Sequence, residues 1–130
     1  MNFDIRKMTR RDVRKYGLPS LLRSDREVLV AIAGDELAAY GVLNLETGEM
    51  ESLYTEPEYR GMGAGTKIMS VFGPRITQIN VDTTNKNAIG LYQHLGFKKF
   101  TNMNSRLALM TREQIRMRRL ARLFESCLND

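Results

Sequence analysis

Alternating hydrophobic and polar positions in the first half of the chain predict β-strands joined by short turns. Two runs rich in β-branched and apolar residues flank Gly34-Asp35, a pair that favours a two-residue hairpin turn. Thr47-Gly48 marks a second turn, and the segment "EMESLYT" that follows it alternates with the period of a strand. The predicted strands cover residues 3–8, 26–33, 36–46 and 49–55.

After Gly63 the spacing of apolar residues becomes that of helices. Ala64, Ile68 and Phe72 recur every four residues, and Gly73-Pro74 ends the pattern. A second helix is predicted over 85–95, with Gly96 as its C-terminal stop. Its apolar face consists of Ala88, Leu91, Tyr92 and Leu95. Further strands are predicted over 75–81, 97–100 and 105–110, so the order of elements predicts a mixed α/β fold.

Two segments outside this pattern are basic. Residues 9–25 are interrupted by Gly17 and Pro19 and have room for one helix and a turn. Residues 111–130 predict an amphipathic, basic C-terminal helix that follows a domain of residues 1–110, with Thr111 and Gln114 in a capping-box pattern. Three roles for this helix remain open: packing on its own sheet, a dimer contact, or a contact with nucleic acid. Its apolar positions are Ile115, Met117, Leu120, Phe124, Cys127 and Leu128.

Composition narrows the class of protein. The chain has 130 residues, of which 42% are hydrophobic and 27% charged, as expected for one globular domain. It contains no run of about eighteen apolar residues and no apolar core near its N-terminus, so we expect neither a membrane span nor a secretory signal. Cys127 is the only cysteine, which excludes an internal disulfide and indicates a reducing cytoplasm. Because His94 is the only histidine, we expect no metal site.

The net charge of +5 is unevenly distributed. Residues 27–59, called here the acidic segment, contain eight acids and no Lys or Arg. Residues 60–110 contain seven Lys or Arg and a single acid, Asp82. The simplest interpretation of this uneven distribution is that the charges are scattered over the surface. The alternative is that the acidic segment attracts cations and the following loop region attracts anions.

Residues 60–65 read "RGMGAG", which is an unusual concentration of glycine before a helix. A P-loop would need Lys-Ser/Thr after its last glycine, but Gly65 is followed by Thr66-Lys67. A dinucleotide fingerprint would need a third glycine where Thr66 stands. A strand-to-helix turn that binds a pyrophosphate fits better, because glycines let the backbone approach closely and the helix dipole favours an anion. A simple tight turn is the alternative.

The segment "RGMGAG" matches R/Q-x-x-G-x-G/A, the motif of the GNAT superfamily of N-acetyltransferases, and the sequence therefore resembles that family. Further along, "NKNAIGLYQHLGF" is similar to the family's second signature, N-x-x-A-x-x-L-Y-x-x-L-G-F. With the strands around them, the resemblance covers residues 3 to 110. It implies a GNAT-like, mostly antiparallel central sheet flanked by helices, here with an extra C-terminal helix.

The resemblance also implies that acetyl-CoA is the co-substrate, without a metal. Backbone amides from Gly61 through Thr66 would bind its pyrophosphate, and the Leu53 amide would donate to the thioester carbonyl. Tyr92 would face the thioester sulfur, and Asn85 would lie near the pantetheine or the adenosine. The full set of implied co-substrate residues is Leu53, Tyr54, Thr55, Arg60, Gly61, Met62, Gly63, Ala64, Gly65, Thr66, Asn85 and Tyr92.

Acetyl transfer to an amine makes further chemical demands. A lysine-like amine, with a pKa of about 10.4, is almost fully protonated at pH 7, so a carboxylate must accept a proton directly or through water. A strand amide can stabilise the developing oxyanion. Tyr92 can protonate the leaving thiolate, although a buried aromatic on a helix face is the alternative interpretation.

The base is less well defined than the proton donor. Glu49 stands where histone-type members of the family carry their glutamate base, and Glu51 shares its strand face if no bulge intervenes. The alternative for each glutamate is that it is an ordinary surface residue without a catalytic role. Asp82 is a third candidate, whereas His94 fits a helix surface. Where ribosomal-protein-type members have a glutamate, this chain has Asn80.

We therefore predict an N-acetyltransferase that transfers an acetyl group from acetyl-CoA to a primary amine. The acidic segment favours a cationic acceptor, either a peptide or protein amine or a small cationic amine, over a nucleobase. The family normally has two helices where this chain has residues 9–25, and the shorter wall favours an open acceptor groove. The competing hypothesis is a non-catalytic binding protein that contacts nucleic acid or a protein partner through its basic ends. A homodimer through the C-terminal helix remains open.

Overall fold

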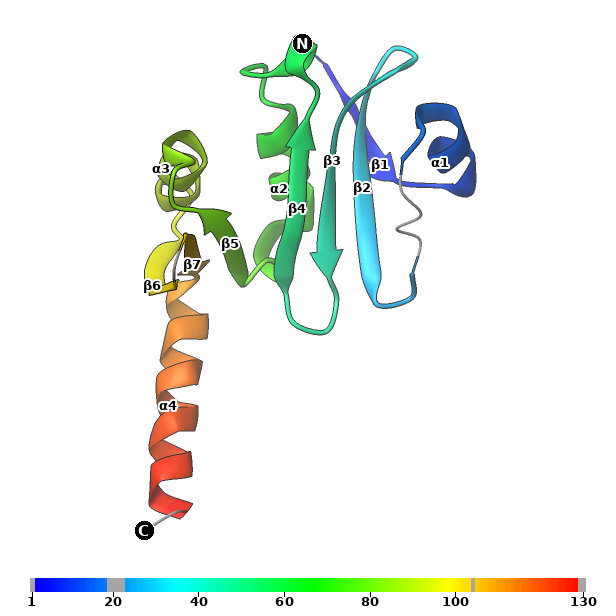
Figure 1. Ribbon diagram of the computed structural model, residues 1–130. Coiled ribbons are helices and arrows are strands. Elements are labelled where there is room, and N and C mark those ends of the chain that lie inside the picture. The colour runs from blue at the N-terminus through cyan, green and yellow to red at the C-terminus, as the bar shows by residue number, and fades with distance from the viewer. Residues whose placement is uncertain (1, 19–22, 104, 129–130) are drawn as a thin grey trace. The chain divides into compact units, whose positions relative to one another are not determined.

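The structure is a computed structural model that describes residues 2–18, 23–103 and 105–128 (Figure 1). The chain divides into two compact units, Met1–Ile76 and Thr77–Asp130. Each unit combines antiparallel strands with helices, which confirms the predicted mixed α/β fold with a mostly antiparallel sheet and an additional C-terminal helix. No helix among the described residues is long and apolar enough to cross a membrane.

The described strands of the first unit form an antiparallel sheet in which each strand pairs with the one before it. Gly34, at φ +63°, and Asp35 form the predicted hairpin turn, with Ala33 opposite Glu36. The second and fourth strands have the predicted bounds, and the third ends earlier than predicted, at Asn44. The strands are β1 (Asp4–Lys7), β2 (Arg26–Ala33), β3 (Glu36–Asn44) and β4 (Glu49–Thr55).

Two helices, α1 (Arg10–Tyr16) and α2 (Ala64–Phe72), cover opposite faces of this sheet. On one face, α1 packs on a buried cluster that includes Val42 of β3. The Cβ position of Gly41 faces the other side of the sheet, because the side chains of successive residues in a strand alternate between the two faces. A Cβ atom at Gly41 would lie only 2.8 Å from Ile68 Cγ2 of α2. The glycine therefore lets α2 lie close to β3.

The second unit contains a smaller antiparallel sheet with the strand order β5–β7–β6. Its elements are β5 (Gln78–Asp82), α3 (Lys86–His94), β6 (Lys98–Met103), β7 (Arg106–Met110) and α4 (Arg112–Leu128). At the start of α4, the Gln114 amide donates to Thr111 Oγ1 (3.2 Å), as the capping pattern predicts. The side chains of Phe124, Cys127 and Leu128, which belong to the predicted apolar stripe, lie outside the described part of the chain.

Several predicted bounds differ from the observed ones, and the strand predicted over 97–100, for example, extends to Met103 as β6. The strand predicted over 75–81 begins only at Gln78, because the proline after Gly73 starts a 3₁₀ turn, η2 (Gly73–Arg75). Leu95 was predicted on the apolar face of the second helix, but it is 42% exposed. It is the C-cap residue of α3, so the helical periodicity no longer directs its side chain toward the core.

Candidate functional site

The glycine segment connects β4 to α2 through a short 3₁₀ turn, η1 (Pro57–Tyr59). Gly61 and Gly63 have φ angles of +78° and +86°, and no heavy atom lies within 4 Å of the Cβ position of either residue. Residues other than glycine are strained at such angles. At Gly61 and Gly63 the backbone is therefore open to a ligand.

The first turn of α2 adds hydrogen-bond donors to this surface. The first backbone bond of the turn runs from the Lys67 N–H to Gly63 O (3.0 Å). The N–H groups of Ala64, Gly65 and Thr66 therefore have no acceptor within the helix. Such groups, together with the helix dipole, form a binding site for phosphate. The donor set at this turn fits a pyrophosphate.

Two cationic side chains flank the same turn. Arg60 Nε donates to Thr55 O (3.3 Å), which holds the exposed guanidinium beside the end of β4. Lys67 Nζ lies 5.4 Å from the ring centroid of Phe3. Phe3 in turn makes an edge contact with Tyr59 of η1, with 6.2 Å between the ring centroids. Both cations increase the attraction of the glycine turn for an anion.

The structure brings β4, which contains the implied co-substrate residues Leu53 and Thr55, next to the glycine turn. The Cβ position of Gly65 lies 3.5 Å from Leu53 Cδ2 and 3.6 Å from Thr55 Oγ1. Tyr54 points to the opposite face of the sheet, where its ring centroid lies 5.8 Å from that of Tyr40. Within the first unit, the side chains of Leu53 and Thr55 therefore face the first turn of α2, and that of Tyr54 does not.

Glu51, one of the two glutamates proposed as bases, lies in a β-bulge of β4. Val42 is opposite Ser52, whereas Leu43 is opposite Met50, so Glu51 is the additional residue of β4. The condition under which Glu49 and Glu51 would share a strand face is therefore not met.

The two glutamates also differ in their contacts. The carboxylate of Glu51 forms an ion pair with Arg26 of β2 and accepts a hydrogen bond from Asn44 Nδ2 (3.4 Å). Its charge is therefore held by a neighbouring cation. At the start of the same strand, the Glu49 amide donates to Thr47 Oγ1 (3.2 Å), and the residue is half-buried.

Asn85 and Tyr92, from the second signature, belong to the second unit. Asn85 is the N-cap of α3, and its Oδ1 accepts a hydrogen bond from the Ala88 amide (3.2 Å). Tyr92 is 7% exposed, and burial raises its pKa. A tyrosine with a raised pKa keeps its proton at neutral pH, as a proton donor must.

The remaining base candidates also lie in the second unit. Asp82 Oδ1 accepts hydrogen bonds from the Thr84 hydroxyl (2.7 Å) and the Thr84 amide (2.9 Å). These bonds lower the pKa of Asp82, which makes it a weaker base. His94 is exposed at the last residue of α3. Among the described residues, no three His, Cys, Asp or Glu side chains are arranged to hold a metal ion.

The structure adds a feature that the sequence did not reveal, a cavity of about 590 Å³ in the first unit. Four of its lining residues are acids of the acidic segment. Lys15 pairs with one of them, Asp35 (3.5 Å), and Tyr59 donates to another, Glu36. The acidic residues can be read from the sequence, but the cavity combines three separate segments of the chain. Its lining is Lys15, Tyr16, Asp35, Glu36, Leu37, Glu56, Glu58 and Tyr59.

Comparison with known proteins adds a family match to this geometry. The acetyltransferase (GNAT) domain matches residues 24–99 of the chain. An uncharacterized N-acetyltransferase of Methanocaldococcus jannaschii is 33% identical over 61 residues, which cover 42% of this chain. The matched region spans only 27% of that relative.

Solved acetyltransferase structures share the fold. The PaiA N-acetyltransferase of Thermoplasma acidophilum, in complex with coenzyme A, superposes with a TM-score of 0.66 at 21% identity, covering 85% of this chain and 99% of that one. A ribosomal-protein alanine N-acetyltransferase of Escherichia coli gives a TM-score of 0.66 at 16% identity, covering 83% and 90% of the two chains.

Proposed function

The chain belongs to the GNAT acetyltransferase family, and we propose that it transfers an acetyl group from acetyl-CoA to a primary amine. The observation that carries this proposal is the glycine turn. Its positive-φ glycines leave the backbone open, its helix N-terminus supplies bare amides, and Leu53 and Thr55 of β4 lie beside it. These features fit the pyrophosphate and the start of the pantetheine arm of acetyl-CoA.

Acetyl-CoA supplies an activated acyl group as a thioester. Residues of the chain would bind it, stabilise the oxyanion and protonate the leaving group. Amides of Gly61 through Thr66 would bind the pyrophosphate, with Arg60 alongside. The Leu53 amide would donate to the thioester oxygen as negative charge develops there. The Tyr92 hydroxyl would give its proton to the departing sulfur, and Asn85 would contact the pantetheine or adenosine side.

We propose Glu49 as the group that accepts the proton of the acceptor amine, directly or through water. The contacts of Glu51 support this choice over its neighbour. The carboxylate of Glu51 already contacts Arg26 and Asn44, so it would have to leave both groups to reach an acceptor amine. Asp82 is disfavoured for another reason, because its lowered pKa makes it a weaker base.

The proposed acceptor is a cationic amine, belonging to a peptide, a protein or a small molecule. The acidic segment supports this choice, since four of its carboxylates line one cavity of the first unit. A cation gains favourable interactions near such a cluster, whereas a nucleic acid phosphate is repelled.

Binding of acetyl-CoA provides the direct test. At a concentration 100-fold above its Kd, acetyl-CoA should stabilise the fold by about 2.7 kcal/mol, which a thermal melt detects readily. Gly63→Asp should abolish this shift, because a side chain and a negative charge would meet the pyrophosphate.

Gly34→Asp is the matched control. Gly34 also has a positive φ and open space at its Cβ position, so the two substitutions impose similar strain and the same charge. The control variant should keep the shift. No shift of the parent protein at millimolar acetyl-CoA would refute the proposal.

A further inference from the structure

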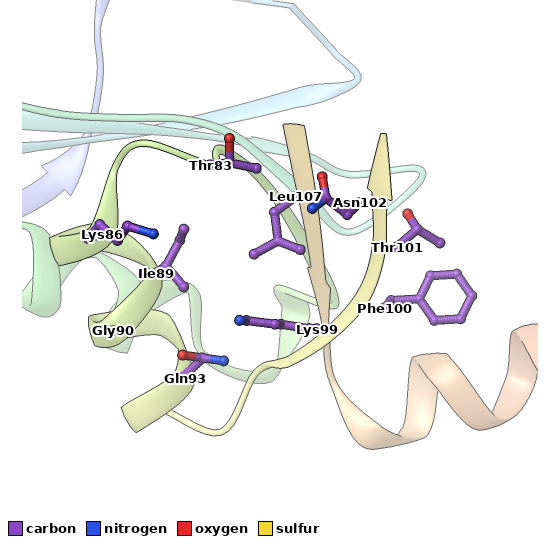
Figure 2. A pocket seen from close by; sticks show the side chains of 10 residues that line it. All are labelled: Thr83, Lys86, Ile89, Gly90, Gln93, Lys99, Phe100, Thr101, Asn102 and Leu107. Atoms are coloured by element: carbon purple, nitrogen blue, oxygen red, sulfur yellow. The ribbon is translucent and has the colours of Figure 1, made fainter. Parts of the chain in front are cut away.

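The second unit contains a cavity of about 510 Å³ formed by α3, β6 and β7 (Figure 2). A volume of this size suits a small metabolite. None of its lining residues belongs to the proposed acetyl-CoA set. The lining residues are Thr83, Lys86, Ile89, Gly90, Gln93, Lys99, Phe100, Thr101, Asn102 and Leu107.

Two lysines extend into this cavity from different elements. Lys86 begins α3 and Lys99 lies on β6, and Figure 2 shows their side chains directed into the same space, on either side of Ile89. No carboxylate lines the cavity, and within the described ranges neither ammonium group has an ion-pair partner. An anion bound between the two ammonium groups would interact favourably with both.

The other lining groups define the rest of the ligand. The Gln93 and Asn102 amides and the Thr83 hydroxyl can donate hydrogen bonds to an anion. Ile89 and the buried Leu107 form an apolar surface. Gly90 has no heavy atom within 4 Å of its Cβ position, so this part of α3 leaves room for a ligand.

We propose that this cavity binds a small anionic ligand, whose carboxylate or phosphate groups contact Lys86 and Lys99 and whose apolar part lies on Ile89 and Leu107. Charge-assisted hydrogen bonds from ammonium groups are among the stronger polar contacts available to such a ligand. The inference is independent of the proposed acetyltransferase activity, since it uses different residues.

Amide-detected NMR titration of the full chain tests the proposal with two probes, citrate for carboxylates and phenyl phosphate for a phosphate on an apolar ring. Each titration is run with and without saturating CoA, which separates this cavity from the glycine turn. We expect at least one probe to shift the amides of Thr83, Gly90 and Asn102, with the same Kd whether or not CoA is present.

Lys99→Gln and Lys98→Gln form a matched pair for this titration. The two lysines are neighbours on β6 and the substitutions remove the same charge, but only Lys99 lines the cavity. Lys99→Gln should weaken probe binding about tenfold, the loss expected for one charge-assisted hydrogen bond. Lys98→Gln should change it less than twofold.

Three results would overturn the proposal. The first is that neither probe shifts these amides at 10 mM, roughly the weakest affinity worth assigning to a specific site. The second is an equal loss of binding in both variants, which would mean that only the net charge matters. The third is displacement of both probes by CoA, which would assign the cavity to the co-substrate.

Discussion

At the residue scale, the side chain that determines the N-terminal structure most clearly is Asp12. It is only 3% exposed, and Arg6 donates to both of its carboxylate oxygens, at 2.6 and 2.8 Å. The Thr9 amide donates to the same carboxylate (2.7 Å), which completes the capping box of α1. The hydrogen bond from Arg6 lowers the pKa of Asp12 well below its usual range, although burial alone would raise it.

Asp12→Asn should therefore destabilise the protein by about 2 kcal/mol at pH 7, since it removes the charge that accepts both hydrogen bonds from Arg6. Because the folded-state pKa is depressed, the contribution of Asp12 is present above its unfolded-state pKa and is lost as the pH falls through the folded-state pKa. The difference between parent and variant should accordingly shrink in strong acid. Urea denaturation across pH measures it. Asp35→Asn, at an exposed pair with Lys15, is the control and should change stability by less than about 1 kcal/mol.

The proposal that the Tyr92 hydroxyl protonates the leaving thiolate can be tested by substitution. Tyr92→Phe keeps the buried ring and removes only the hydroxyl, so acetyl-CoA affinity should hold while kcat falls roughly 100-fold, the smaller end of the range for a general acid. Steady-state kinetics and acetyl-CoA titration separate the two effects. Tyr40→Phe is the control and should leave kcat unchanged. If kcat of Tyr92→Phe stays at the parent value while chemistry limits the rate, Tyr92 is a core aromatic and nothing more.

Glu49 and Glu51 differ in the pH profile that their loss should produce. Glu49→Gln should move the optimum of kcat/KM to higher pH, where the acceptor amine is neutral without help. Glu51→Gln should leave the optimum in place, because that carboxylate is held by Arg26. The reverse result would assign the base to Glu51 and show that the bulge directs its side chain to the acceptor.

At the scale of elements, periodicity allowed most strands and helices to be predicted, because burial of one face determines them. The bulge in β4 could not be predicted, since it depends on which residues of β3 pair with Met50 and Ser52. The ion pair of Glu51 with Arg26 depends on the same strand register, so it could not be predicted from the sequence either. The conformation of the glycine turn was easier to predict, because Gly61 and Gly63 have positive φ angles that glycine alone adopts readily.

Packing of α2 on β3 yields a prediction about stability. Gly41→Ala places a Cβ atom 2.8 Å from Ile68 Cγ2 and 3.2 Å from Phe72 Cε2, both in fully buried side chains. Overpacking of this kind should cost about 1–3 kcal/mol. Gly90→Ala, in α3, meets no atom within 4 Å and should instead stabilise by about 0.5–1 kcal/mol. Chemical denaturation measures both, and a neutral Gly41→Ala would mean that α2 moves away from β3 without cost.

At the scale of the whole molecule, the acidic segment is less negative than its sequence suggests. Glu27 pairs with Lys7 (3.3 Å) and Arg75 (2.8 Å), both from outside the segment. Burial alone would raise the pKa of Glu27, but hydrogen bonds from Arg75 and Lys7 outweigh it and leave the pKa lowered. Glu51 and Asp35 are paired in the same way. We therefore assign the attraction of the proposed cationic acceptor to Glu56 and Glu58 of the cavity.

Attraction of this kind depends on ionic strength, and the acceptor prediction can be tested through that dependence. With acetyl-CoA saturating, kcat/KM for a lysine peptide flanked by cationic residues should fall several-fold between low and physiological salt, because salt screens interactions between exposed charges over about 8–10 Å. A peptide with the same reactive lysine but neutral flanks should show a weaker dependence. Glu56→Gln combined with Glu58→Gln should reduce the difference between the peptides. Equal salt dependence for both peptides, or acetylation of nucleic acid in preference to either, would show that the acidic segment does not select the acceptor.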